Sequence, residues 1–366
     1  MSFPTNLLEP VQSLARVADD LKLRFAWRDT TVDLMMLALV SRENLLLLGP
    51  HGVGRSALAN QLATSLQCDL FQYQIRHDTE TGELFNSTAK SLDKTALALL
   101  EDVFLASSPV LNALLCLIRD RITGKLPVSA QSVFVKVTEL PDDPTVQGFL
   151  DQITLRCRVD PVPDSALSTL LEKNGQVTPT ESALAVPFHL DQIVPIYQAL
   201  PHVTLGEVPT LYLDLLRRMR LEGITFSDRR IVRGLLLVRA AALLDQRTQA
   251  TPRDLWPLLH LWNTPNDLEI LRDIVQPVVS EAGGSPLLEN YPSLEDLRED
   301  LAILETRKHT NLKDTPALNA HLTALSQIRR DLMLQYPNAM DLITRAEAAL
   351  EWALELLSPA TKTKCG

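Results

Sequence analysis

Three of the thirteen glycines in this 366-residue chain lie close together, at Gly49, Gly52 and Gly54. The segment GPHGVGRS, residues 49–56, follows an apolar run and precedes an alanine- and leucine-rich stretch. It matches the phosphate-loop pattern G-x-x-x-x-G-K-[ST], except that arginine stands in the lysine position. Glycines let backbone N–H groups turn toward phosphate oxygens, a helix N-terminus favours anions, and a serine hydroxyl can ligate Mg²⁺. The pattern predicts a nucleotide-type loop; an ordinary glycine turn between strand and helix is the alternative.

Arg55 is the departure from this pattern. The lysine of the pattern is a compact charge that reaches the β- and γ-phosphates, whereas arginine is longer, planar and forked. Arg55 therefore keeps the positive charge but is not expected to fit the same slot.

The elements around the loop alternate between strand and helix. Periodic apolar positions predict helices over residues 5–42, 56–63 and 109–121. Short apolar or β-branched runs predict strands over 44–48, 69–75, 133–137 and 155–159, whereas 96–100 fits either a strand or a helix. The alternation predicts an α/β fold with a parallel sheet flanked by helices, and residues from about 165 onward are predicted to be helical throughout.

Composition excludes several classes of protein. Hydrophobic residues make up 46% of the chain, so it can bury a sizeable core. The net charge of −10 argues against a nucleic-acid partner. The four cysteines form no CxxC pair, so neither a zinc site nor a disulfide framework is expected. Free cysteines fit a reduced, cytoplasmic location. No transmembrane segment and no signal peptide are predicted.

Several segments, in order, resemble the MoxR branch of the AAA+ ATPases, most closely the RavA-like group. The segment NLLLLGPHGVGRSALA (44–59) resembles the Walker A strand, loop and helix, and residues 98–115 resemble Walker B and the helix after it. The other matching segments are FAWR (25–28), TETGELF (79–85), FVKVTELP (134–141), DQITLRCRV (151–159), FSDRR (226–230) and QATPRDL (249–255). The resemblance covers about residues 5–285.

The resemblance implies a P-loop NTPase fold of the AAA+ kind. Its three expected parts are a nucleotide-binding core (1–163), an all-α lid (164–265) and a helical C-terminal extension (266–366). It also implies ATP and Mg²⁺ as ligands. The nucleotide-binding residues would be Gly49, Pro50, His51, Gly52, Val53, Gly54, Arg55, Ser56, Ala57 and, as sensor 2, Arg229. Ser56 and Glu101 would hold the metal, and the catalytic positions would be Glu101, Asp102, Thr138 and Arg156.

The departures from the family pattern lie at the catalytic positions. Walker B ends in Asp-Glu in the family, but here the order is Glu101-Asp102, so each carboxylate is displaced by roughly one C–C bond, about 1.5 Å. A misplacement of about 1 Å can cost on the order of 10²-fold in rate. Sensor 1 is Thr138 instead of asparagine, and the arginine-finger position holds the neutral Gln152, with Arg156 as a possible substitute. The segment between Phe85 and Ala98 is also too short for the helical insert and β-hairpin of the family.

Two hypotheses follow from different classes of protein. The first is an ATPase, a homo-oligomer and by resemblance a hexamer, which remodels or matures a partner of the von Willebrand factor A-domain (vWA) kind. Its hydrolysis would be weakened by the altered positions. The second is an inactive AAA+ scaffold or adaptor that binds partners with little or no ATP turnover.

Overall fold

The computed structural model describes residues 3–85, 91–123, 132–162, 167–175, 188–284, 294–306 and 339–357, with single residues and short runs between 318 and 336. The chain divides into two compact units. The larger unit is Met1–Val162 with Ala166–Glu289, and the smaller is Pro163–Ser165 with Asn290–Gly366.

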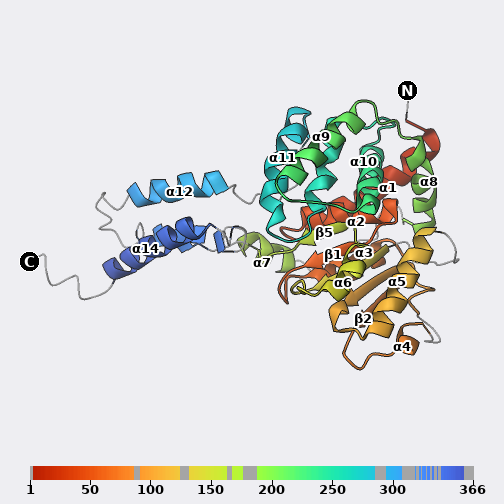
Figure 1. The fold of residues 1–366 in the computed structure, drawn as a ribbon, viewed down its shortest axis with the longest axis horizontal. Coiled ribbons are helices and arrows are strands. Elements are labelled where there is room, and N and C mark those ends of the chain that lie inside the picture. The colour runs from red at the N-terminus through yellow and green to blue at the C-terminus, as the bar shows by residue number, and fades with distance from the viewer. Residues whose placement is uncertain are drawn as a thin grey trace, which may run out of the picture. The chain divides into compact units, whose positions relative to one another are not determined.

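A sheet of five parallel strands lies in the larger unit, in the order β2-β3-β4-β1-β5 (Figure 1). The strands are β1 (Leu45–Leu48), β2 (Leu70–Gln74), β3 (Leu97–Glu101), β4 (Ser132–Val137) and β5 (Leu155–Arg158). Every residue of β1 and β3 is buried, as expected for parallel strands covered on both faces. The predicted parallel sheet is confirmed, and the ambiguous segment 96–100 is a strand.

The register aligns the carboxyl ends of the central strands. Leu48 of β1 lies opposite Val137 of β4, and Glu101 of β3 lies opposite Lys136 of β4. Ligands of open parallel sheets bind at this edge, outside the carboxyl ends of the strands. The glycine loop leaves β1 at the same edge.

Helices of the first half of the chain surround the sheet. They are α1 (Thr5–Arg24), α2 (Asp29–Ser41), α3 (Arg55–Ser65), α4 (Thr81–Phe85), α5 (Ser108–Thr123) and α6 (Pro144–Leu150), with the 3₁₀ turn η1 (Val103–Leu105). α2 packs against β1 and β5, and α3 packs against β2 and β3. The helices predicted over 5–42, 56–63 and 109–121 are confirmed, with a break between α1 and α2.

Further helices form the second half of the larger unit. They are α7 (Leu167–Gly175), η3 (Leu190–Gln192), α8 (Ile193–Ala199), η4 (Leu200–His202), α9 (Val208–Leu221), α10 (Asp228–Leu244), η5 (Pro252–His260) and α11 (Asp267–Glu281). Figure 1 shows α9, α10 and α11 gathered at one end of the unit. α10 begins after Ser227, whose Oγ accepts a hydrogen bond from the backbone N–H of Arg230, an N-cap. α10 also packs on α2, so one apolar core runs from the sheet into these helices.

Helix α11 lies within the segment predicted as the C-terminal extension, which was expected to begin at residue 266. This helix packs on η5 and α9, so it lies in the larger unit. Leu271, Val275 and Val279 are its buried residues, spaced four apart along one face. The smaller unit holds α12 (Leu294–Thr306) and α14 (Met340–Leu357), which pack around their own apolar core and share an ion pair between Glu305 and Arg345 at 2.7 Å.

Within the described ranges, no helix combines the length and apolar character needed to cross a membrane.

Candidate functional site

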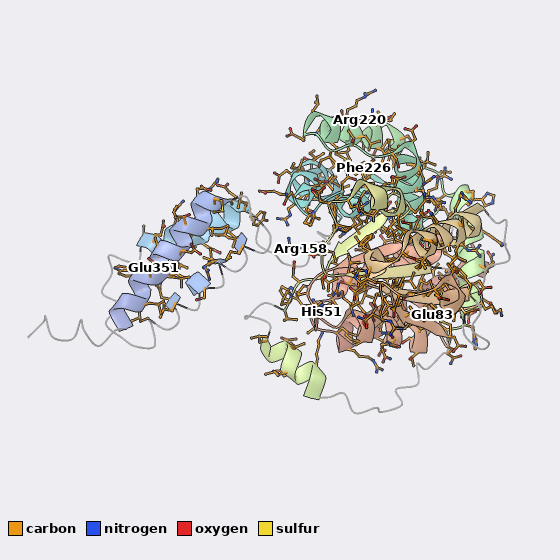
Figure 2. All side chains as sticks on the ribbon, turned by 60° about the horizontal axis from the view of Figure 1, so that its bottom comes forward. His51, Glu83, Arg158, Arg220, Phe226 and Glu351 are labelled. Atoms are coloured by element: carbon orange, nitrogen blue, oxygen red, sulfur yellow. The ribbon has the colours of Figure 1, made fainter. Side chains whose placement is uncertain are left out.

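The glycine loop has the backbone that a phosphate-binding loop requires. A Cβ atom at Gly49 would lie 2.1 Å from the carbonyl oxygen of Val159, so only glycine fits there. Gly52 and Gly54 have φ angles of +85° and +84°, in the left-handed region that favours glycine. α3 begins directly after Gly54, and His51 lies exposed on the loop (Figure 2). The backbone N–H groups of the loop and the N-terminus of α3 can therefore receive phosphate oxygens.

The side chain of Arg55, in the lysine position, is held by backbone carbonyl oxygens. Its guanidinium is buried and donates to the carbonyl oxygens of Leu47 at 2.8 Å, Val137 at 2.5 Å and Pro50 at 2.9 Å. Burial lowers the pKa of the guanidinium, although the neighbouring carboxylates act in the opposite direction. Arg55 thus joins the ends of β1 and β4 and fixes the start of the loop.

Lys136, which belongs to none of the predicted site positions, lies beside the loop. Lys136 Nζ lies 3.0 Å from Ser56 Oγ and 2.5 Å from Glu101 Oε2. Ser56 Oγ in turn donates to Glu101 Oε1 at 3.1 Å, and Gln72 Nε2 donates to the same oxygen at 2.8 Å. The two predicted metal ligands are therefore brought together, with an ammonium group bridging them.

The electrostatics of Glu101 follow from these contacts. Partial burial favours the neutral carboxyl, but hydrogen bonds from Lys136, Gln72 and Ser56 together outweigh burial and lower the pKa of Glu101. The carboxylate is charged and its charge is balanced by the ammonium group.

This donor set does not fit Mg²⁺. Mg²⁺ requires oxygen ligands in near-octahedral arrangement and would have to lie beside the Lys136 ammonium, which already contacts both Ser56 and Glu101. The contacts of Ser56 and Glu101 are those of an ion-pair network.

Asp102 and Thr138 follow the ends of two neighbouring strands. Asp102 has a left-handed φ of 53°, and its Oδ2 accepts a hydrogen bond from Gln74 Nε2 at 3.3 Å. Thr138 is exposed in the bend after β4. Both polar side chains therefore lie at the carboxyl edge of the sheet.

Arg28, from the segment FAWR, holds the loop in place. Its side chain is buried and donates to the carbonyl oxygens of Val53 at 3.1 Å and Asp160 at 2.9 Å. Burial raises the pKa of the Asp160 carboxyl, and its ion pair with Arg158 acts against this rise. Arg28 thus ties the glycine loop to the chain that follows β5.

Arg156 lies among residues of the lid. It is buried, donates to the carbonyl oxygens of Asn263 at 2.7 Å and Leu150 at 3.0 Å, and lies over the ring of Trp262. Burial and the nearby Arg230 lower the pKa of Arg156 to about 9. These contacts join β5 to the lid, and none of them involves the glycine loop.

Arg229, the predicted sensor 2 residue, pairs with Asp151 across the junction of core and lid. Arg229 Nη1 lies 3.3 Å from Asp151 Oδ2, and Ser227 Oγ donates to the other oxygen of the same carboxylate at 2.6 Å. Nearly half of the Arg229 side chain is exposed. Gln152, at the finger position, is half-buried and its backbone carbonyl accepts from Asn44 at 3.2 Å.

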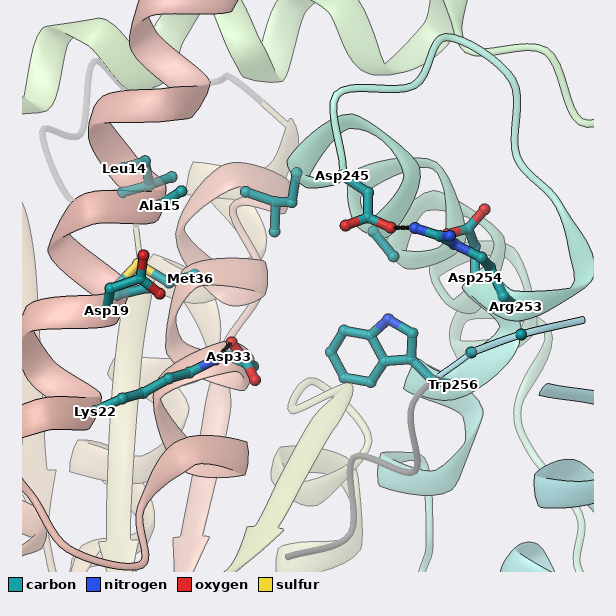
Figure 3. Close-up of a pocket in the computed structure, with 15 residues that line it drawn as sticks. Leu14, Ala15, Asp19, Lys22, Asp33, Met36, Asp245, Arg253, Asp254 and Trp256 are labelled. Atoms are coloured by element: carbon teal, nitrogen blue, oxygen red, sulfur yellow. Dashed lines mark ion pairs between the residues drawn. The ribbon is translucent and has the colours of Figure 1, made fainter. Parts of the chain in front are cut away.

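A cavity of about 430 Å³ lies away from the loop, between α1, α2 and the lid (Figure 3). Four of its charged side chains form two ion pairs with one another: Lys22 with Asp33 at 2.6 Å, and Arg253 with Asp245. Trp256 lines one wall. The glycine loop contributes no residue to this cavity.

The fold and the loop together define a P-loop ATPase core of the AAA+ class with its lid. Residues 12–194 match the MoxR domain of the MoxR–vWA–β-propeller ternary systems, and residues 210–275 match an AAA lid domain. The chain belongs to the MoxR family of AAA+ ATPases.

Two relatives come from Methanocaldococcus jannaschii. The uncharacterized protein MJ0079 is 22% identical over 347 residues, covering 88% of this chain and 90% of the relative. The uncharacterized protein MJ0812 is 25% identical over 277 residues, covering 69% and 72%. The crystal structure of a candidate ATPase from Cytophaga hutchinsonii is similar with a TM-score of 0.60 at 14% identity, covering 75% of this chain and 96% of that one. At this identity the structural similarity supports the fold.

Proposed function

We propose that this MoxR protein binds ATP at the loop formed by Gly49–Ala57 and acts as a chaperone-like protein that remodels or matures a partner. In this proposal hydrolysis is slow, and nucleotide occupancy serves mainly to set the conformation of the core and lid.

The glycine loop is the single observation that carries ATP binding. Its two left-handed glycines leave open space where a Cβ would lie, and the helix that follows supplies unpaired N–H groups. A triphosphate fits this environment because the N-terminus of α3 carries partial positive charge.

The contacts of three side chains support slow hydrolysis. Arg55 is held by three carbonyl oxygens, so it is not directed at the γ-phosphate. Glu101 is bound by Lys136, Gln72 and Ser56, which leaves it poorly placed to activate water. Arg156, the candidate for a finger, donates to carbonyl oxygens within the core–lid junction.

The partner is inferred from the family. The matching family is described by systems in which a MoxR domain acts with a vWA protein and a β-propeller protein, so we propose a vWA partner for this chain. Assembly into a homo-oligomer, by resemblance a hexamer, a RavA-like role and a cytoplasmic location belong to the same proposal.

The second candidate is a scaffold without turnover. It is favoured by Gln152, which is neutral where the family carries an arginine finger that would contact the nucleotide of a neighbouring subunit. In that case ATP, or the empty loop, would only stabilise one arrangement of core and lid.

The melting temperature in the presence of ATP tests the proposed binding. A ligand that binds only the folded state raises its stability in proportion to the logarithm of ligand concentration, so ATP should raise the melting temperature progressively. An unchanged melting temperature at millimolar ATP contradicts binding.

Steady-state phosphate release separates the ATPase from the scaffold. Slow release that is lost in the double variant Glu101→Ala, Asp102→Ala supports the ATPase, and no release above background supports the scaffold. Light scattering that shows a monomer with and without ATP contradicts the oligomer.

A further inference from the structure

We propose that the Lys136 ammonium takes the position of the metal ion beside the loop, so that this protein binds ATP without Mg²⁺. The inference rests on the proposed ATP binding and adds to it the cation that faces the phosphates.

The position of Lys136 is built into the sheet. Lys136 lies opposite Glu101 in the register of β4 and β3, so the two side chains leave neighbouring strands side by side. The ammonium group contacts Glu101 Oε2 at 2.5 Å and Ser56 Oγ at 3.0 Å. These are the two side chains that the resemblance assigns to the metal, and Lys136 is bound to both of them.

Charge argues against a metal ion in addition to Lys136. A divalent cation within reach of Ser56 and Glu101 would lie next to the ammonium group, and like charges at such a distance repel strongly in a partly buried site. The Lys136 and Glu101 side chains are only 16% and 11% exposed, so water screens this repulsion weakly.

Lys136 also supplies a positive charge beside the loop, whereas the guanidinium of Arg55 is taken up by three backbone carbonyl oxygens. An ammonium group has three N–H donors. Within the described part of the chain, Ser56 and Glu101 accept two of them, which leaves one for a phosphate oxygen. Because Ser56 is the second residue of α3, that donor lies beside the helix N-terminus where the loop would hold the phosphates.

Calorimetric titration with ATP, once in excess MgCl₂ and once in EDTA, tests this inference. We expect the wild-type dissociation constants in the two buffers to agree within about threefold, less than the tenfold change that corresponds to 1.4 kcal/mol. The variant Lys136→Met should bind ATP at least about tenfold more weakly in EDTA. It should regain affinity when Mg²⁺ is added, since Ser56 and Glu101 are then released.

Two further variants keep the result interpretable. Lys136→Met together with Glu101→Gln removes the carboxylate that the single variant leaves unpaired, and it should bind ATP weakly in both buffers. Lys94→Met, an exposed lysine outside the cluster, should match the wild type. Melting temperatures of all variants show that each one is folded.

The experiment distinguishes failure of this inference from failure of the proposed ATP binding. Wild-type binding that requires Mg²⁺, or a Lys136→Met variant that binds as tightly as the wild type in EDTA, overturns the role of Lys136 and leaves ATP binding intact. No binding by the wild type in either buffer overturns the proposed function itself and, with it, this inference.

Discussion

The guanidinium of Arg55 donates a hydrogen bond of 2.5 Å to the backbone carbonyl of Val137. The residue in the lysine position of the loop therefore binds backbone carbonyl oxygens at the ends of β1 and β4 and at Pro50. Arg55 therefore stabilises the shape of the loop, and the ammonium group beside Ser56 belongs to Lys136.

The buried position of Arg55 predicts a structural role. Arg55→Met should lower the free energy of unfolding by roughly 2–4 kcal/mol, because three buried carbonyl oxygens lose a charged donor. Urea unfolding measures this loss, with the exposed Arg220→Met as the matched control. If both variants unfold alike, Arg55 does not hold the ends of β1 and β4.

Gly49 should be the least replaceable glycine of the loop. Gly49→Ala places a methyl group 2.1 Å from the carbonyl oxygen of Val159 and should cost roughly 3 kcal/mol of unfolding free energy. Gly148→Ala, in α6 and with open space around its Cβ position, should be neutral or stabilising. Equal stabilities of the two variants, measured by thermal unfolding, would show that the close approach at Gly49 is absent.

His260 makes stability depend on pH. Burial lowers the pKa of this imidazole from 6.5 to about 4, so the folded protein holds it neutral while the unfolded chain protonates it. The unfolded state then binds more protons between these values, and stability is lost as pH falls below about 6.5, by at most about 1.4 kcal/mol per pH unit.

The variant His260→Phe tests this assignment, since phenylalanine can keep the edge-on contact with Trp256. Urea unfolding from pH 7 to about pH 5 should give a flatter profile for the variant than for the wild type. If the unfolding free energies of the two proteins change with pH in parallel, a group other than His260 causes the pH dependence.

Substitutions of two arginines at the core–lid junction should lower the free energy of unfolding by very different amounts. Arg156→Met removes a buried donor to two carbonyl oxygens and should cost roughly 2–4 kcal/mol. Arg229→Met breaks an exposed ion pair with Asp151 and should cost less than about 1 kcal/mol. Denaturant unfolding of both variants provides the comparison, and a larger loss for Arg229 would reverse the assignment.

Much of this fold is predictable from local patterns. The apolar run before Gly49 and the alanine-rich stretch after Gly54 are a strand and a helix, because burial on both faces and helical periodicity leave clear signatures. Residues 96–100 fitted either a strand or a helix, since alanine and leucine suit a buried strand as well as a helix. The extent of the lid was less clear, because the packing of α11 on η5 and α9 is a tertiary property.

The site was less predictable than the fold. The family resemblance assigned Ser56 and Glu101 to one metal ion, but the direction of the Arg55 side chain depends on Val137 of β4, 82 residues further along the chain. The sequence does contain one indication of the role of Lys136. A charged residue within the apolar strand FVKV must meet an opposite charge. Its partner is defined only by the register of β4 against β3.

Binding of ATP at the glycine loop is the central claim, and calorimetric titration of the wild type beside Gly52→Val tests it most directly. Open space surrounds the Cβ position of Gly52, so the variant should fold, but its valine disfavours the φ of +85° and would crowd the phosphates. We predict saturable, one-to-one binding of ATP by the wild type and at least about tenfold weaker binding by the variant. Equal affinities, or no binding by the wild type, would contradict this account.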